Sequence, residues 1–556
     1  MNQTRLFLIF AWLMLATLLW MEWGKEKVAP ATPAVTSSSA TTGAVPSATG
    51  VPAATGIPAA PGAAPSANAV AAAPTARIEV TTDVLRVTLD GNGLLSADLL
   101  KYPSLAASKS APVRLLADDG THYFVARSGW THGDAAAPTF VPENAARTVA
   151  LGNDGSVVVP FVATGADGVT IRRTYTFQRG SYVVQVRDDV RNAGSAPWQG
   201  HVWRELTRVP RVVEGKGPMS PESYSFQGAA WFSAQDKYEK CKYDEFAEDC
   251  ELNKQVTGGW IGMLQHHFFA SWIPQPDQAA LYALRQGDGR YTIQAQGPAF
   301  TVPVGGSATT TARLWVGPKL VKQIQAQNVP GLERAVDFSS WDWAAVLAGW
   351  LFWVLEKLHG LLGNWGWSIV GLVVLLKALM YPLSAAQYKS MAKMRKFQPR
   401  IKQLQERYGD DKQKLQMAMM ELYKKEKINP VGGCLPILLQ MPVFLCLYWM
   451  LSESVELRHA PWIGWITDLT ARDPYFLLPA LNLGVMWLTQ KMTPPAPGMD
   501  PMQQKMMQFM PLVFGELFAF KPAGLMLYWI TNGGLGLLQQ WWMTKRYAEE
   551  PAKATA

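Results

Sequence analysis

Six apolar segments constrain this chain more than any other feature of its sequence. Each carries at most one charged residue, and they occupy residues 6–21, 365–383, 434–451, 475–488, 506–520 and 523–542. Such runs are typical of helices that cross a bilayer, which takes about 20 residues. Pro479 and Pro511 weaken two of the shorter segments as helices. The sequence nevertheless predicts a membrane protein with six spans.

The first apolar segment has two interpretations. A cleaved signal peptide is one, but Glu22-Trp23-Gly24-Lys25 follows directly, where small residues would be needed for cleavage. The Ala-rich region further along leaves room for a later cleavage site. We favour an uncleaved transmembrane anchor over residues 1–24.

A segment without charge follows the anchor. Residues 28–76 consist chiefly of Ala, Pro, Thr, Ser, Gly and Val. Such a composition has few large side chains with which to build a core. We therefore predict a disordered linker over residues 25–76.

Residues 77–317 have the pattern of a β-rich domain. Leu85, Val87 and Leu89 alternate with polar residues, as in a strand with one buried face. Residues 170–177 and 182–190 flank a short turn sequence, which predicts a hairpin. We expect one large, mostly antiparallel β-sandwich.

The β-rich region lacks the usual sequence signatures of catalysis. It contains no P-loop, GxSxG, HExxH or metal-spaced Cys/His cluster. We expect a structural role for the pair His266-His267, and we expect no metal and no catalytic residue. Cys241 and Cys250 lie nine positions apart, and a disulfide would form between them if the domain is extracytoplasmic.

Residues 341–362 form a candidate amphipathic helix. Leucine and tryptophan recur at helical spacing, while Asp342, Glu356 and several glycines lie on a narrower opposite stripe. This pattern is typical of a helix that lies in the membrane interface. The alternative is the outer half of one long spanning helix, and Gly363-Asn364 favours a break instead.

Charge sets the expected topology. Residues 384–430 carry twelve Lys and Arg against five acids, a net +7 of the whole chain's +8. The positive-inside rule places this loop in the cytoplasm, with both termini inside and the β domain outside.

The basic loop has its own predicted structure: residues 412–427 form a helix, and a preceding arm is kinked or broken near Pro399. One interpretation is a topology determinant that touches anionic lipid, which composition alone favours. The other is a docking platform for nucleic acid or a ribosome.

Lys377 stands in an otherwise apolar stretch, and a charge at the bilayer centre costs roughly 3 kcal/mol on insertion scales. In one interpretation the ammonium extends to the interface, because residue 383 is only about 9 Å further along a helix. In the other it faces a hydrated cavity. We favour the second because polar residues occur on several other spans, namely Gln440, Thr489, Gln490, Glu516, Thr531, Asn532, Gln539 and Gln540.

Several motifs then occur in a characteristic order. They are Met380-Tyr381-Pro382-Leu383, Ser390-Met391-Ala392-Lys393-Met394, Gly409-Asp410-Asp411-Lys412, residues 429–434, Gln440-Met441-Pro442, residues 500–505 with 510–511, and Gly524-Leu525-Met526-Leu527-Tyr528-Trp529. On these motifs the chain resembles the YidC family of bacterial membrane protein insertases. The β domain fits the Gram-negative form of that family by architecture, as a supersandwich of the sugar-mutarotase type.

The resemblance implies a function. Such proteins place hydrophobic segments of nascent chains in the inner membrane, alone or beside the Sec translocon, as neither enzymes nor cofactor-dependent machines. A hydrophilic groove holds one cation, here Lys377 where the family usually has Arg. Lys keeps the charge and loses the planar fork. The expected groove residues are Lys377, Gln440, Met441, Phe444, Glu516, Tyr528, Trp529, Thr531 and Asn532.

The basic loop would receive the client, the ribosome or the signal-recognition receptor. The expected contacts are Lys389, Lys393, Arg395, Lys396, Arg400 and Lys402. The chain would thus be a multi-pass inner-membrane protein with a periplasmic domain and cytoplasmic termini.

These expectations divide the chain. After the anchor and linker come the β domain (77–317) and a connector with the interfacial helix (318–363). The spans are residues 364–383, 431–452, 474–491, 506–521 and 522–543. The loops are residues 384–430, 453–473 and 492–505, and the tail is 544–556.

Three other protein classes compete with an insertase. A secondary transporter or channel with an outer binding domain is the main alternative, but we detect no internal repeats. An enzyme acting on sugars would need a carboxylate and histidine pair that we do not find, and fold alone does not imply function. A tethered periplasmic scaffold leaves Lys377 and the basic loop unexplained.

Overall fold

The computed structural model of the chain describes residues 76–106, 110–120, 122–133, 137–210, 225–246, 250–339, 341–387, 397–408, 411–425, 435–493, 509, 515 and 518–548. The predicted anchor, nearly all of the linker, much of the basic loop and most of the fifth predicted span lie outside these residues.

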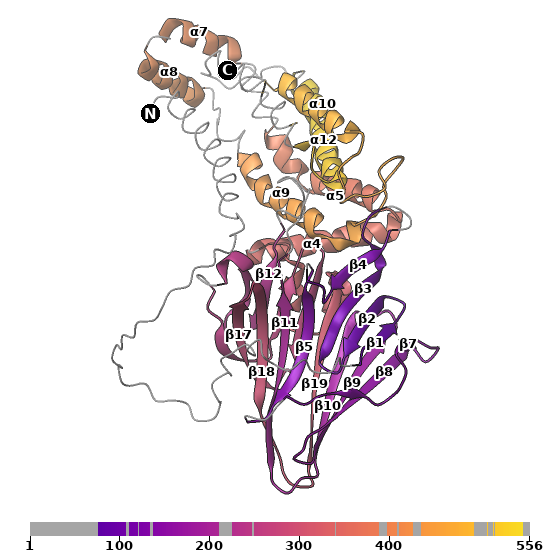
Figure 1. Ribbon diagram of the computed structural model, residues 1–556. Coiled ribbons are helices and arrows are strands. Elements are labelled where there is room, and N and C mark those ends of the chain that lie inside the picture. The colour runs from indigo at the N-terminus through magenta and orange to yellow at the C-terminus, as the bar shows by residue number, and fades with distance from the viewer. Residues whose placement is uncertain are drawn as a thin grey trace, which may run out of the picture. The chain divides into compact units, whose positions relative to one another are not determined.

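The described strands form two sheets (Figure 1). The ten-stranded sheet has the order β14 (Asn253–Thr257), β17 (Ala279–Gly287), β18 (Arg290–Val302), β11 (Trp198–Arg208), β5 (Phe124–Thr131), β3 (Gly93–Pro103), β2 (Leu85–Asp90), β1 (Ile78–Thr81) and β7 (Thr148–Ala150), with β4 (Pro112–Leu116) on β3. The nine-stranded sheet has the order β13 (Lys237–Lys242), β12 (Gly228–Ser233), β15 (Trp260–Leu264), β16 (Phe268–Pro274), β19 (Ser307–Pro318), β10 (Val183–Asn192), β9 (Val169–Gln178), β8 (Ser156–Thr164) and β6 (Val141–Pro142).

Strand pairing follows the predicted antiparallel pattern. Among the described strands, only β1 and β7 pair in parallel. The predicted hairpin forms between β9 and β10, with Val184 opposite Phe177. Gly180 occupies the turn at φ +69°, a conformation that glycine adopts without strain.

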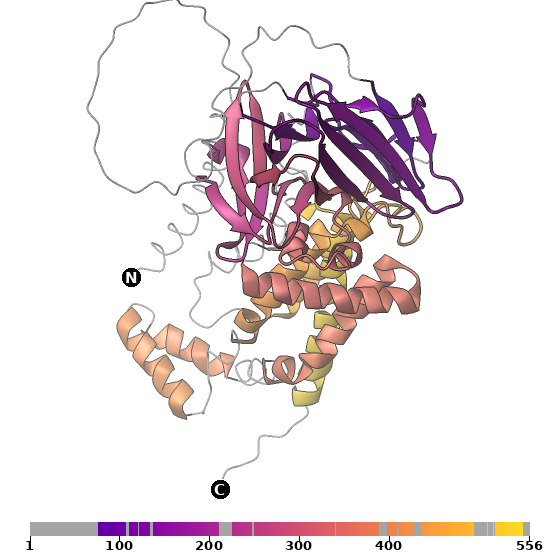
Figure 2. The same cartoon turned by 90° about the horizontal axis from the view of Figure 1, so that it is seen from below.

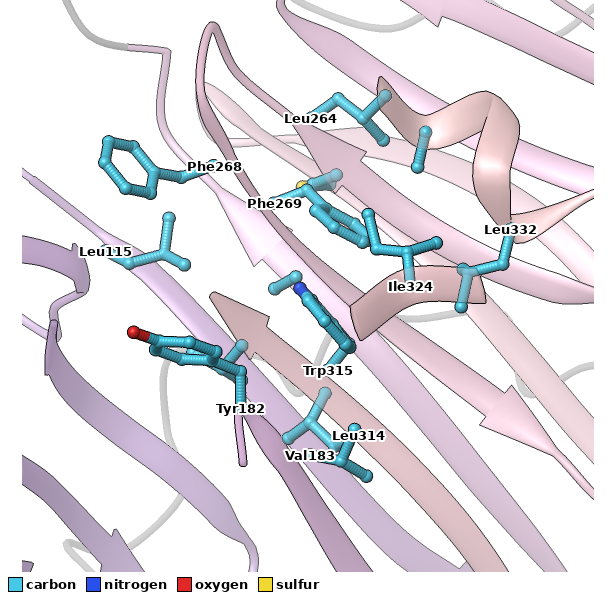
Figure 3. Packing of buried hydrophobic residues seen from close by; sticks show 14 of the residues in the cluster. Leu115, Tyr182, Val183, Leu264, Phe268, Phe269, Leu314, Trp315, Ile324 and Leu332 are labelled. Carbon is cyan, nitrogen blue, oxygen red and sulfur yellow. The ribbon is translucent and has the colours of Figure 1, made fainter. Parts of the chain in front are cut away.

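The core lies where the two sheets face each other. Tyr102 of β3 packs edge-on against Phe268 of β16, with ring centroids 5.6 Å apart. The Trp272 indole of β16 donates to the Glu205 carbonyl of β11 at 3.0 Å. Figure 3 shows Phe269 and Trp315 of this core beside Ile324 and Leu332, which belong to α3 (Val321–Gln325) and the short 3-10 helix η2 (Leu332–Val336). The helices that follow β19 therefore extend the core of the domain.

A buried ion pair joins β9 to β10 inside this core. Arg173 is fully buried, and its Nε and one terminal nitrogen donate to the two oxygens of Asp188 at 2.7 and 2.6 Å. The guanidinium also donates to the carbonyls of Gly91 and Ser128. The Trp130 indole donates to Asp188 at 2.8 Å. The pair is thus saturated with hydrogen bonds that reach both sheets, as a buried charge requires.

A disulfide bond joins Cys241 at the end of β13 to Cys250, with the Cα atoms 6.1 Å apart. The short 3-10 helix η1 (Tyr243–Glu245) lies between them. The bond closes the loop that follows this edge strand.

The helical region follows the β domain. Its described helices are α4 (Asp342–Leu362), α5 (Trp365–Leu379), α7 (Gln398–Tyr408), α8 (Lys412–Lys425), α9 (Leu435–Glu453), α10 (Leu477–Met492) and α12 (Ala523–Ala548). The helices α10 and α12 lie side by side, and α7 and α8 form a helical hairpin (Figure 1, Figure 2). The helix predicted from residue 412 to 427 is observed to Lys425, and α7 begins next to Pro399.

A sharp break separates α4 from α5, as Gly363-Asn364 predicted. Gly363 ends α4 at φ +66°, and the Asn364 side chain accepts a hydrogen bond from the Trp367 amide to begin α5. The same side chain donates to the carbonyls of Pro461 and Trp462. The break is therefore fixed by a cap and by a loop from elsewhere in the chain.

The described helices include few that would cross a bilayer unaided. By length and composition α4 qualifies, and α5 together with residues Tyr381–Gln387 makes a second candidate that is bent by 63°. The exposed face of α4 is aromatic, with Trp343, Trp350 and Trp353 each more than half exposed. This face suits the interfacial position predicted for the helix. The count of six spans stays a prediction.

The β domain and the C-terminal end of α9 share a polar junction. Glu453, the last residue of α9, accepts a hydrogen bond from the Ser225 hydroxyl at 3.0 Å. Arg458 donates to the carbonyl of Pro103 at 2.8 Å. Glu456 of the short 3-10 helix η4 (Val455–Leu457) accepts a weak hydrogen bond from the Val321 amide at 3.4 Å. Its other carboxyl oxygen is buried and has no hydrogen-bond partner among the described residues.

This junction predicts a pH dependence of stability. Burial, with a further contribution from Glu356, raises the pKa of Glu456 from 4.5 to about 7. The folded state then binds the proton more tightly than the unfolded state, so this group's contribution to stability falls as pH rises from 4.5 to about 7. We expect Glu456→Gln to stabilise the protein at pH 8 by about 3 kcal/mol and to have little effect at pH 4. Thermal unfolding of both proteins in detergent tests this, and an equal difference at the two pH values would contradict it.

Candidate functional site

Three helices of the apolar region line an open-sided cavity of about 180 Å³. Each helix contributes residues at helical spacing, which places them on one face. The lining residues are Val373, Leu376 and Lys377 of α5 with Met380 at its C-cap, Gln440, Met441, Val443, Phe444 and Leu447 of α9, and Tyr528 and Asn532 of α12. Lys377, Gln440, Met441, Phe444, Tyr528 and Asn532 were predicted as groove residues, and the structure brings all six together.

Lys377 supplies the positive charge of this cavity. Its side chain is half-buried. Gly536 of α12 faces the ammonium, since a Cβ atom built there would lie 3.8 Å from the Lys377 Nζ, an ordinary van der Waals distance. Within the described part of the chain, Lys377 forms no ion pair. The amides of Gln440 and Asn532 add polar groups to the same wall. The cavity can therefore present a cation to an incoming anionic group.

An aromatic cluster forms one wall beside the cation. The Phe444 ring lies 6.0 Å from Tyr528 and stacks on Trp529 at 6.4 Å. Phe518 in turn contacts Trp529, with centroids 4.2 Å apart. Trp529 thus stands behind Phe444 as support. A rigid aromatic wall beside a cation suits an apolar segment that carries a negative charge.

Other predicted groove residues have different surroundings. The Thr531 hydroxyl donates to the Leu527 carbonyl of its own helix at 2.7 Å. Glu516, another predicted groove residue, lies outside the described residues. Sequence reasoning missed the apolar lining at Val373, Leu376 and Met380, although Val373 and Met380 stand four and three positions from Lys377 and Leu376 is next to it.

The predicted cytoplasmic contacts are described only in part. Arg400 is exposed on α7, with its guanidinium 5.7 Å from the Phe397 ring. Lys389, Lys393, Arg395 and Lys396 lie outside the described residues, as does the side chain of Lys402.

His266 and His267 serve the junction. Their rings stack 3.8 Å apart, and the His266 Nε2 contacts the Ser452 carbonyl at 2.9 Å. Burial lowers the pKa of His267 well below its usual value, which favours the neutral imidazole. Among the described residues, no group of three or more His, Cys, Asp or Glu side chains is arranged to hold a metal ion.

Fold and site together define a class: a membrane protein in which a large antiparallel β domain is joined to apolar helices around a cation-bearing cavity. Comparison with known proteins agrees. The family described as YidC periplasmic domain matches residues 77–354, and that described as 60Kd inner membrane protein matches residues 357–550. The chain belongs to the YidC family of membrane protein insertases.

Individual relatives match over the full chain. The membrane protein insertase YidC of Stenotrophomonas maltophilia strain R551-3 is 59% identical, covering 100% of this chain and 98% of the relative. The protein of the same name from Xanthomonas axonopodis pv. citri strain 306 is 55% identical, covering 100% and 99%. A crystal structure described as an active YidC insertase with its first transmembrane domain resolved matches 84% of this chain and 92% of its own, at 18% identity and TM-score 0.36. The sequence matches carry the assignment.

The assignment has direct consequences. The chain is an inner-membrane insertase with a periplasmic domain, and not an enzyme. Its substrates are membrane proteins. The alternatives of a transporter, a sugar-active enzyme and a tethered scaffold are therefore set aside.

Proposed function

We propose that the cavity around Lys377 is the groove through which this insertase receives its clients. Moving a short hydrophilic tail across the bilayer is the difficult step, because polar groups without partners are costly in lipid. A hydrated groove shortens the apolar distance. The Lys377 ammonium attracts acidic residues of the incoming tail, and the apolar segment then moves into lipid.

The observation that carries this proposal is the position of Lys377 in the cavity. If the Lys377 side chain extended to the membrane interface, its ammonium would lie away from the apolar residues that flank it in the sequence. Instead it shares a cavity with Gln440, Tyr528 and Asn532 on two other helices. That arrangement suits a cation that binds acidic residues of the client transiently.

The client route runs along α9 and α12 in this proposal. Met441 is 46% exposed at the rim of the cavity, and Phe444 lies one helical turn further along. Methionine adapts to apolar side chains of many shapes, which suits clients of varied sequence. Trp529 supports the aromatic wall by packing against Phe444. The proposed route also includes Glu516 and Thr531, which the sequence analysis predicted as groove residues.

The proposed topology has six spans, with both termini in the cytoplasm and the β domain in the periplasm. The net charge of +7 in residues 384–430 supports it. The division of the chain into domains and spans, and the supersandwich form of the β domain, belong to the same proposal.

The α7–α8 hairpin is the proposed cytoplasmic receiver. Met417 and Met420 are more than half exposed on α8, and Arg400 is exposed on α7. Apolar and basic groups on one hairpin suit either a nascent chain or the acidic surface of a ribosome or a signal-recognition receptor. The Sec translocon is the proposed membrane partner.

Crosslinking to a stalled nascent chain tests this route. We expect a photoreactive residue at Met441 to form adducts with the apolar segment of a client. The matched control is Trp350, which is also exposed and apolar but lies on α4. Adducts of equal yield from both positions, or none from Met441, would contradict the route.

A further inference from the structure

A second cavity, of about 660 Å³, lies at the C-terminal end of α9. It is lined by residues of the β domain, of the segment before α4 and of the last turn of α9. Its volume is within the range of sites that hold small molecules. The insertion mechanism proposed for the Lys377 groove makes no use of it.

The cavity carries cations and anions side by side. The Lys240 ammonium donates to both oxygens of Asp337 at 2.9 and 3.0 Å, and Lys242 donates to Glu245 at 3.1 Å. An ammonium has three donors, so each lysine retains hydrogen-bonding capacity. Lys240 and Lys242 can therefore both donate hydrogen bonds to a phosphate.

Glu453 supplies the opposite charge. One of its oxygens accepts from Ser225, and the other lies 3.9 Å from the Lys319 Nζ, beyond hydrogen-bond distance. The Lys319 ammonium is fully buried and has no hydrogen-bond partner among the described residues. The second oxygen of Glu453 thus forms an ion pair with Lys319 without a hydrogen bond, and it can accept a hydrogen bond from a ligand.

Aromatic residues continue from the cavity onto an exposed apolar surface. Trp341 and Trp449 line it and meet edge-on, with centroids 5.8 Å apart. Trp341 is 56% exposed and stacks on Trp343 of α4 at 6.1 Å. Tryptophan favours the boundary between water and lipid. This inference rests on the proposed topology, in which the periplasmic surface of the inner membrane lies at this level.

We infer that this cavity binds the headgroup of a zwitterionic phospholipid that carries a primary ammonium. The phosphate contacts Lys240 and Lys242, the ammonium donates to Glu453, and the acyl chains leave along Trp341. An anionic headgroup has no ammonium to donate to the second oxygen of Glu453. A quaternary ammonium has no N–H to donate to Glu453.

Native mass spectrometry of the full chain in detergent tests this inference. Phosphatidylethanolamine, phosphatidylcholine and phosphatidylglycerol are added separately, with soluble phosphoethanolamine as a further ligand. We expect phosphatidylethanolamine to bind about 10-fold more tightly than the other two lipids, and far more tightly than phosphoethanolamine. Equal binding of the three lipids, or tight binding of phosphoethanolamine, would overturn the inference.

Variants locate the site. Lys242→Ala and Glu453→Gln are each expected to weaken phosphatidylethanolamine binding about 10-fold. The matched control is Lys254→Ala, because Lys254 is similarly exposed and pairs with Asp236 as Lys242 pairs with Glu245. Unchanged binding by Lys242→Ala would overturn the inference even if Glu453→Gln fails to fold. Lys377→Ala should bind the lipid normally, so a failure of the groove proposal is distinguishable from a failure here.

Discussion

Replacing Lys377 with alanine is expected to slow insertion of clients with acidic tails about tenfold, which corresponds to about 1.4 kcal/mol in the barrier. Two unit charges 4 Å apart attract by about 4 kcal/mol at an effective dielectric constant of 20, and a partly hydrated cavity retains a fraction of this. Insertion in cells depleted of the native insertase measures the effect.

Two variants serve as controls for this result. Lys377→Arg keeps the charge and is expected to support insertion. Lys491→Ala removes a lysine of α10 that lies outside the cavity, over the Trp487 ring, and should leave insertion unchanged. Full insertion of acidic-tailed clients by Lys377→Ala would show that the charge is not needed. Failure of Lys377→Arg would show that side-chain geometry matters more than charge.

The β domain offers the second large effect. Asp188→Ala removes one partner of the buried pair and leaves the Arg173 guanidinium without its counter-charge. Removing one member of such a pair typically costs about 3–5 kcal/mol. We therefore expect a large fall in the thermal unfolding temperature of the full chain in detergent.

The adjacent residue provides the control. Asp189 pairs with Arg187, whose side chain is 57% exposed, and exposed pairs contribute at most about 1 kcal/mol. Asp189→Ala should therefore change the unfolding temperature little. Similar changes for the two alanine variants would mean that burial does not determine the contribution of these carboxylates.

The buried pair of Arg173 and Asp188 follows from the alternation of its two strands, although we did not predict it. Arg173 is in phase with Ile171, Tyr175 and Phe177, all of which are buried on β9. Asp188 is likewise in phase with buried valines of β10. The alternation along these strands implies the inward position of both charges, but we did not predict it, because charged residues are usually taken as exposed.

The assignment of strands to two sheets was beyond the sequence. The β9–β10 hairpin is local, and its turn residues predict it. In contrast, β11 pairs with β5 and with β18, which are distant in the chain. Such pairing depends on packing between the sheets rather than on local propensity.

The cavity was predictable in part from one unusual residue, and the resemblance to the YidC family supplied part of its apolar and aromatic lining. A lysine among apolar residues indicated the site, and Gln440 and Asn532 gave polar companions. The hydrogen bonding of Thr531 was not predictable, because a hydroxyl in a helix can bond to its own backbone as well as face a cavity.

A charge reversal tests the central claim most directly. Lys377→Glu is combined with a client whose acidic tail residues are replaced by lysine, and insertion is measured for all four pairings. The account predicts that Lys377→Glu fails with the acidic tail and regains insertion with the basic tail. Equal insertion of both tails by Lys377→Glu would contradict the claim that the charge of this residue attracts the client.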